Sequence, residues 1–257
     1  MDQPVKDQKQ ERPSGGLCAH CPLAPAFPEA GRCQPGDACV RAHSGRQIDR
    51  FFRRNPAEAE DYLDDIFWER RAIAARYAPI DRIFRLRTDS DEVVRRVVAS
   101  RLPDTQLVAM TGDPDREVRL SVAARLPENE LQRLIDDRDY LIRATVARRL
   151  PHGQLAQLAR DPEREVRKVI ASRLPPFALH LLADDPEPEV RALVAERALP
   201  ELAARLLADS EWWVRLAAVG NAPPALLPPL LDDPELEVRE AVAHRLAENN
   251  DTPTAGK

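Results

Sequence analysis

The stretch Asp113-Pro114-Asp115-Arg116-Glu117-Val118-Arg119 belongs to a pattern that recurs every 24 residues and decides the fold. In each of seven copies an Asp is followed six positions later by an Arg, with Val or Ile directly before the Arg. The Asp residues are Asp89, Asp113, Asp137, Asp161, Asp185, Asp209 and Asp233, and the Arg residues are Arg95, Arg119, Arg143, Arg167, Arg191, Arg215 and Arg239. Seven copies in register indicate a tandem-repeat protein.

Each unit begins with a segment that we expect to form an α-helix. Asp113 is a suitable N-cap, and Pro114 fits the first helical position. Pro127 disfavours helical geometry at the residue before it, so the helix should end there. Between these signals the apolar residues fall on one helical stripe, which consists of Val118, Val122, Ala123 and Leu126.

A second, shorter helical turn is expected in the rest of each unit. It is indicated by apolar pairs three residues apart, namely Leu131 with Leu134, Leu155 with Leu158, and Leu179 with Leu182. Two full helices with their connections would not fit into 24 residues. No unit can bury its stripe alone, so neighbouring units must stack. The sequence therefore predicts an all-α solenoid over residues 89–247, whose hand the periodicity does not fix.

The flanks of the repeats are less regular. Residues 56–88 form a degenerate unit that would cap the solenoid, with Asn55-Pro56 starting a helix. The apolar residues assigned to that helix are Leu63, Ile66, Phe67, Ile73 and Ala74. Residues 1–14 and 248–257 are polar, and we expect both to be disordered. Within the repeats, local irregularity is expected where Leu-Pro or Arg is replaced, which happens at Ala198-Leu199, Gly220-Asn221 and Ala247.

Composition and charge limit the function. The 257 residues are 32% charged and carry a net charge of −5. No run of 18 apolar residues could span a bilayer, and no secretory pattern is visible, so we expect a cytoplasmic protein without membrane contact. Residues 1–55 have a balance of +3 and the remainder a balance of −8, which disfavours nucleic-acid binding by bulk charge.

Four cysteines lie within 22 residues, in the pattern C-x2-C-x11-C-x5-C. They are Cys18, Cys21, Cys33 and Cys39. In a chain without a secretory pattern, such clustering favours a metal over disulfides. Zinc prefers paired C-x2-C knuckles, which the x5 spacing fits poorly, whereas a [4Fe–4S] cluster accepts more varied spacing. Both metals remain open on the spacing, and a metal would supply folding energy to this Pro-rich segment.

The cysteine pattern followed by 24-residue units resembles the leucine-rich repeat variant proteins that bind a 4Fe–4S cluster. The resemblance covers roughly residues 15–247. It implies a right-handed superhelix of alternating α- and 3₁₀-helices, a small cluster domain over residues 15–55, and Cys18, Cys21, Cys33 and Cys39 as ligands of one [4Fe–4S] cluster. It also implies a bacterial cytoplasmic protein associated with nitrogen fixation.

Two further features invite functional interpretations. The repeated Arg residues could bind a polyanion, but their period equals that of the Asp residues, which favours Arg–carboxylate pairs between or within repeats. Trp212 and Trp213 occupy positions that are polar in other units, so they are candidates for a partner-binding anchor, with packing against a neighbouring turn as the alternative. We find no catalytic constellation and expect no enzymatic activity.

The sequence thus predicts a [4Fe–4S]-binding helical-repeat protein. It would dock to a protein partner and pass electrons or report redox state. One alternative is a zinc-capped HEAT-like interaction scaffold without a redox role. A weaker alternative is a nucleic-acid-binding solenoid that uses the repeated Arg residues.

Overall fold

The computed structural model describes residues 15–251 of the chain. It divides into two compact units, residues 1–125 and residues 126–257. The described residues contain helices and turns but no β-strand, and a lone antiparallel bridge pairs Gln34 with Ala38. The all-α class expected from the sequence is therefore confirmed.

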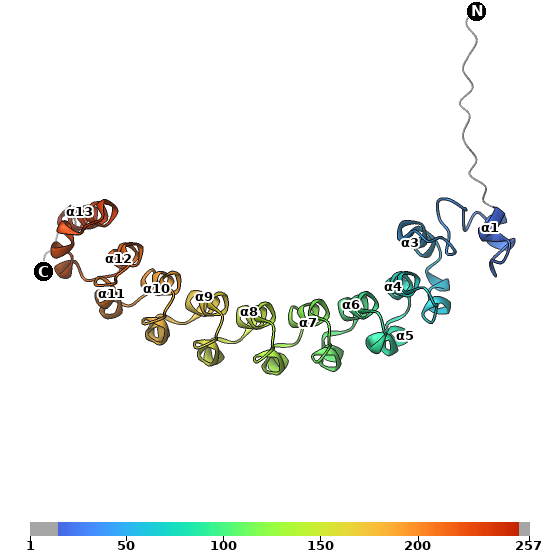
Figure 1. Ribbon diagram of the computed structural model, residues 1–257, viewed down its shortest axis with the longest axis horizontal. Helices are drawn as coiled ribbons and strands as arrows, with labels where there is room; N and C mark the ends of the chain where they lie inside the picture. Colours follow the sequence, from blue (N-terminus) through green and yellow to red (C-terminus); the bar gives the residue numbers. More distant parts are fainter. Residues whose placement is uncertain (1–14, 252–257) are drawn as a thin grey trace, which may run out of the picture. The chain divides into compact units, whose positions relative to one another are not determined.

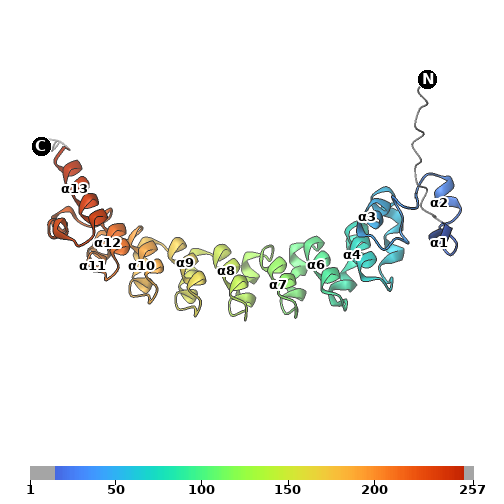
Figure 2. The same cartoon turned by 45° about the horizontal axis from the view of Figure 1, so that its top comes forward.

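The first unit contains the cysteine segment and the first repeats. Its α-helices are α1 (Gly15–Cys18), α2 (Ala26–Glu29), α3 (Gly45–Arg54), α4 (Trp68–Tyr77), α5 (Ile80–Ile83), α6 (Glu92–Arg101) and α7 (Arg116–Ala123). Its 3₁₀-helices are η1 (Pro56–Glu58), η2 (Glu60–Tyr62), η3 (Phe84–Thr88) and η4 (Asp104–Met110). The short helices α1 and α2 lie together at one end, beyond α3 (Figure 2). Along the rest of the unit α3 packs on α4, α4 on α6, and α6 on α7.

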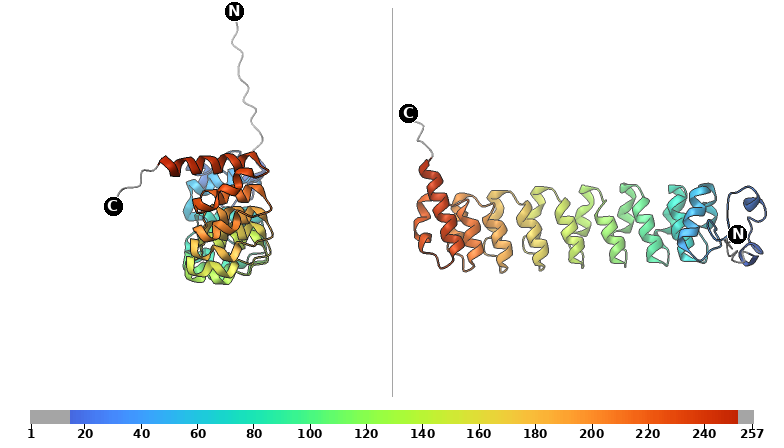
Figure 3. Two further views of the ribbon diagram at one scale, coloured as in Figure 1. Left: turned by 90° about the vertical axis from the view of Figure 1, so that its left-hand side faces the viewer. Right: turned by 90° about the horizontal axis from the view of Figure 1, so that it is seen from above.

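The second unit continues the same alternation. Its α-helices are α8 (Tyr140–Arg149), α9 (Arg164–Arg173), α10 (Pro188–Ala195), α11 (Pro200–Leu206), α12 (Trp212–Val219) and α13 (Leu236–Asp251). Its 3₁₀-helices are η5 (Glu128–Leu134), η6 (His152–Leu158), η7 (Pro176–Leu182), η8 (Pro224–Leu226) and η9 (Pro228–Asp232). Figure 1 shows α8, α9 and α10 in one layer and the 3₁₀-helices in the other. Seen from above, these α-helices lie side by side with nearly parallel axes (Figure 3).

The repeated apolar positions form the core. The stripe residues Val118, Val122, Ala123 and Leu126 are all fully buried. The paired leucines of η5, η6 and η7 are also buried, with at most 4% of each side chain exposed. Burying a Val or Leu side chain contributes about 1.5–3 kcal/mol, so each repeat gains several such contributions once its neighbours are stacked.

The helix start was predicted two residues too early. Asp115, not Asp113, caps α7, and its carboxylate accepts hydrogen bonds from two backbone N–H groups of the first turn, both at 3.0 Å. Asp113 instead accepts the N–H of Asp115 at 2.9 Å and pairs with Arg95 at 2.8 Å. Because the preceding repeat engages the Asp113 carboxylate, the chain turns there, and Pro114 lies outside the helix.

One repeat departs from the alternation. The short element after α10 is the α-helix α11, which lies in the layer of the 3₁₀-helices (Figure 1). Here Leu199 replaces the Pro of other units, and Pro200–Leu206 has the sequence PELAARL, which is rich in strong helix formers. The 3₁₀-helix expected in every repeat is therefore absent from this one, although Ala203 and Leu206 stay buried.

The degenerate unit is also more broken than predicted. The single helix expected from Asn55-Pro56 is divided into η1, η2 and α4. The carboxylate of Asp65 accepts the backbone N–H of Phe67 at 2.8 Å, which turns the chain just before α4. As a result Ile66, which was assigned to the apolar stripe, is 97% exposed.

The C-terminal boundary differs from the prediction as well. Helix α13 continues to Asp251, so residues 248–251 are helical rather than disordered. Ala247 stands where other repeats have the proline that ends the helix, and the helix therefore runs on. The predicted disorder of residues 1–14 and 252–257 concerns positions outside the described residues.

Candidate metal centre

The four cysteines lie on the turns that connect α1, α2 and α3. Cys18 ends α1, and its carbonyl accepts the N–H of Cys21 at 3.2 Å. Cys33 follows α2, and Cys39 precedes α3, with its N–H donating to the carbonyl of Gln47 at 3.2 Å. Gly36, between the last two cysteines, has φ of 87°, a conformation that favours glycine. The turns thus bring together four cysteines that are spread over 22 residues of the sequence.

The thiols influence one another electrostatically. Burial, together with the nearby Cys39, Cys21 and Cys18, raises the pKa of Cys33 above its ordinary value. Burial also raises the pKa of Cys39, and the backbone N–H groups of Arg41 and Ala42 oppose that shift by hydrogen bonding. Four thiolates in one place repel each other, and bound iron or zinc would remove that repulsion. The donor set therefore fits a thiolate-bound metal group.

The segment that carries the thiols has no apolar core of its own. No residue from 16 to 37 is buried. Burial begins at Ala38 and Cys39 and continues into α3, where Phe51 and Phe52 are fully buried. The cysteine turns are therefore anchored on one side only, and a metal group would provide the missing internal support.

Polar contacts tie the cysteine segment to the degenerate unit. Asn55, which is 2% exposed, accepts a hydrogen bond from Arg32 at 2.9 Å and donates to the Arg32 carbonyl at 2.8 Å. Arg70 donates from Nε to the carbonyl of Val40 at 2.7 Å and pairs with both carboxylate oxygens of Asp65. These contacts fix the loop that carries Cys39 against α4.

A cluster of aromatic rings that joins α2, α3 and η2 was not identified from the sequence. Ring centroids lie 6.2 Å apart for Phe27 and Phe51, 5.3 Å for Phe51 and Phe52, and 5.5 Å for Phe52 and Tyr62. Burial and, to a smaller extent, the charge of Cys21 raise the pKa of Tyr62 to about 12. The distribution of aromatic residues could have indicated this cluster, since eight of the twelve lie between residues 27 and 84.

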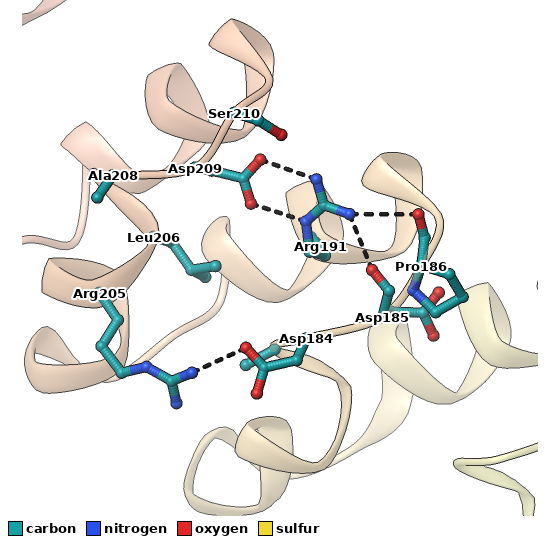
Figure 4. Close-up of a pocket in the computed structure, with 10 residues that line it drawn as sticks. Asp184, Asp185, Pro186, Arg191, Arg205, Leu206, Ala208, Asp209 and Ser210 are labelled. Atoms are coloured by element: carbon teal, nitrogen blue, oxygen red, sulfur yellow. Dashed lines mark hydrogen bonds and ion pairs between the residues drawn. The ribbon is translucent and has the colours of Figure 1, made fainter.

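The repeated Arg residues form ion pairs and hydrogen bonds within the protein. Figure 4 shows the guanidinium of Arg191 bound to both carboxylate oxygens of Asp209 in the next repeat, at 2.7 and 2.8 Å. Its third nitrogen donates to the main-chain carbonyl of Asp185 in its own repeat, at 2.8 Å. The same fork recurs as Arg95 with Asp113, Arg143 with Asp161, Arg167 with Asp185, and Arg215 with Asp233. The predicted pairing of Arg with carboxylate is thus confirmed, and it joins neighbouring repeats.

The second Arg of each repeat reaches back to the preceding helix end. Arg173 donates to the carbonyl of Ala147 at 2.6 Å, and Arg197 donates to Ala171. Asn221, which breaks the Arg pattern, donates to the carbonyl of Ala195 at 3.0 Å. The substitution therefore preserves the bond between repeats.

The two candidate tryptophans lie far from the cysteines in sequence. Trp212 and Trp213 start α12 with their rings edge to face at 5.8 Å, and Trp213 is 37% exposed. No helix within residues 15–251 combines the length and the apolar character that crossing a membrane requires.

Known proteins share both parts of this architecture. Residues 17–61 match the family described as the LRV protein FeS4 cluster, and residues 140–163 and 212–235 match the leucine rich repeat variant. A solved structure, described as a leucine-rich repeat variant with a novel repetitive protein structural motif, is 54% identical with a TM-score of 0.83. That match covers 90% of this chain and 99% of the other.

A curated relative from Rhodobacter capsulatus is named "Uncharacterized 27.7 kDa protein in nifB 3'region". It is 39% identical over 75 residues, which make up 29% of this chain and 31% of the relative.

The fold and the cysteine segment define a class: helical-repeat proteins with an N-terminal iron–sulfur domain. The chain belongs to the leucine-rich repeat variant family. The family expected from the sequence is thereby confirmed.

Proposed function

We propose that Cys18, Cys21, Cys33 and Cys39 hold one [4Fe–4S] cluster and that the protein is a redox-active interaction scaffold. The observation that carries the proposal is that the segment matched by the iron–sulfur family model holds four cysteines, of which Cys18 and Cys21 act electrostatically on both Cys33 and Cys39. Among residues 15–251, there is no group of three or more His, Cys, Asp or Glu side chains that could hold a metal ion as they stand. The x11 and x5 spacings of the cysteines suit a cubane, whose four irons are bound separately, better than a single zinc ion.

The residues around the thiols would serve the bound cluster in distinct ways. The cluster supplies one-electron redox chemistry when bound. The N–H groups of Arg41 and Ala42 stabilise negative charge on the Cys39 sulfur, and hydrogen bonds to sulfur are one determinant of cluster potential. The half-buried Tyr62, which Cys21 influences electrostatically, would shield the bound cluster from water on one side.

The repeats would provide the docking surface, without enzymatic activity, in the cytoplasm. The name of the Rhodobacter capsulatus relative supports a context of nitrogen fixation. On α12, the exposed ring of Trp213 is a candidate anchor for a protein partner, together with Trp212. Binding of nucleic acid is disfavoured because the repeated Arg residues are engaged in forks with Asp.

Redox titration of anaerobically prepared protein tests this function. We expect visible absorbance that dithionite bleaches and oxidation restores, with loss of the signal in Cys39→Ser. A cluster that no reductant changes would contradict the redox role, and a zinc-containing chain would favour the zinc-capped scaffold.

A further inference from the structure

A hollow of about 260 Å³ opens beside the cysteine turns in the first unit. Its lining includes Leu17, His20, Arg41, His43, Ile66 and Phe67. Leu17 is the neighbour of Cys18, His20 is the neighbour of Cys21, and Arg41 lies two residues from Cys39. The hollow is therefore formed by the same turns that carry three of the four thiols.

The chemistry of this hollow is apolar and cationic. No acidic side chain is among its lining residues. Arg70 in its wall is neutralised by Asp65, whereas the exposed Arg41 forms no ion pair with any described residue. His20 and His43 are also exposed, and the His43 ring packs edge-on against Phe67 at 5.9 Å. In a chain with a net charge of −5, the lining thus presents the cation of Arg41 and no acidic side chain.

Ile66 gives the surface an apolar contact point. It is 97% exposed, more than any other large hydrophobic residue of the described part, and Leu17 beside the hollow is 36% exposed. Its position is held by the contact of Asp65 with the Phe67 N–H and with Arg70, so Ile66 projects from a constrained turn. An apolar centre with a charged rim is the usual anatomy of a transient protein interface.

We propose that this surface docks an acidic electron-carrier protein, which inserts an apolar side chain ringed by carboxylates and exchanges one electron with the cluster. The inference rests on the proposed function. The positive charge of Arg41 favours an acidic carrier over a basic one. The attraction between Arg41 and the carrier's carboxylates would steer the carrier to the cysteine turns. One electron leaves the reduced carrier and enters the oxidised cluster, and the carrier departs oxidised.

Stopped-flow electron transfer tests the docking surface. The probe is a reduced, acidic [2Fe–2S] ferredoxin mixed with the full-length, cluster-loaded chain. We expect fast transfer that slows as salt rises, and about tenfold slower transfer with Arg41→Glu or Ile66→Asp. The matched controls are Arg148→Glu and Phe177→Asp, because both residues are exposed and lie on the repeats. Neither control should change the rate.

Dithionite separates the two levels of the proposal. If dithionite does not reduce the cluster, the redox function fails and the docking site falls with it. If dithionite reduces every variant equally but the ferredoxin transfers no electron, or is slowed equally by the variants and their controls, the docking site alone is overturned. The variant Ile66→Asp keeps the test valid if Arg41→Glu impairs cluster loading, because Ile66 is far in sequence from every cysteine.

Discussion

The repeats and the cysteine segment are stabilised in opposite ways. Each repeat buries a stripe and an apolar pair, and Arg–Asp forks join successive repeats. Residues 16–37 bury no side chain at all, yet they carry three of the four thiols. The difference shows that the repeats hold their shape through apolar packing and ion pairs, which the cysteine segment lacks. On the proposed function, a bound metal group would supply the missing support.

Loss of the metal group should therefore have the largest effect, and only on one region. We expect chelation under oxidising conditions, or Cys39→Ser, to abolish hydrogen-exchange protection across residues 15–45 while protection in α8 to α10 is retained. Protection measured by mass spectrometry before and after cluster removal gives the comparison. Unchanged protection in the cysteine segment would show that it folds without metal.

Breaking one fork should be the next largest effect. Arg143→Ala leaves the carboxylate of Asp161 buried and unpaired, with only 2% of that side chain exposed. Removing one partner of a buried pair costs about 3–5 kcal/mol, so the midpoint of urea unfolding should fall. The control is Arg148→Ala on the same helix, since Arg148 is exposed. Equal midpoints for both variants, or loss of affinity for a polyanion at unchanged stability, would contradict the architectural role.

The second contact between repeats allows a graded comparison. Arg173→Ala removes a charged donor from the Ala147 carbonyl, and Asn221→Ala removes a neutral donor from the Ala195 carbonyl. Hydrogen bonds to charged groups contribute about 1.5–3 kcal/mol and neutral ones about 0.5–1.5 kcal/mol, so we expect Arg173→Ala to be more destabilising. Chemical denaturation of the two variants decides the order, and a reversed order would refute this explanation of the Asn substitution.

The smallest effect should appear in acid. Hydrogen bonding to Arg215 holds the pKa of Asp233 below its ordinary value. A carboxylate with a lowered pKa stabilises the fold above the unfolded pKa of about 3.9, and that stability is lost as pH falls through the folded value. Unfolding free energies at pH 7 and pH 3 should therefore differ less in Asp233→Asn than in the parent chain. Identical pH dependence would rule out this contribution.

The 24-residue period was sufficient to predict the repeats, their buried stripe and the Arg–Asp pairs. It did not reveal that Asp113 belongs to the preceding repeat's fork, because a suitable N-cap residue in sequence can be engaged by a distant guanidinium instead. The α-helical form of α11 was not predicted. Pro200 stands one position later than the proline of the other repeats, and the residues after it have high helix propensity. The segment therefore forms an α-helix, although it still buries its apolar residues in the core. Period-based reasoning failed in the degenerate unit, where Asp65 turns the chain and exposes Ile66.

For the candidate site, the spacing of the cysteines predicted a ligand set but not its surroundings. The electrostatic influence of Cys21 on Tyr62 depends on how η2 and α3 pack, which no local pattern encodes. The same holds for the hollow, whose walls come from the cysteine turns and from the turn before α4. Tertiary packing, rather than sequence spacing, brings these residues together.

The content of iron and acid-labile sulfide in anaerobically purified protein tests the central claim most directly. If Cys18, Cys21, Cys33 and Cys39 hold one cubane, the brown protein should contain about four irons and four sulfides per chain. Any single Cys→Ser change should lower both values together. Stoichiometric zinc without iron, in protein isolated from its native host, would contradict the account and favour a zinc-capped scaffold.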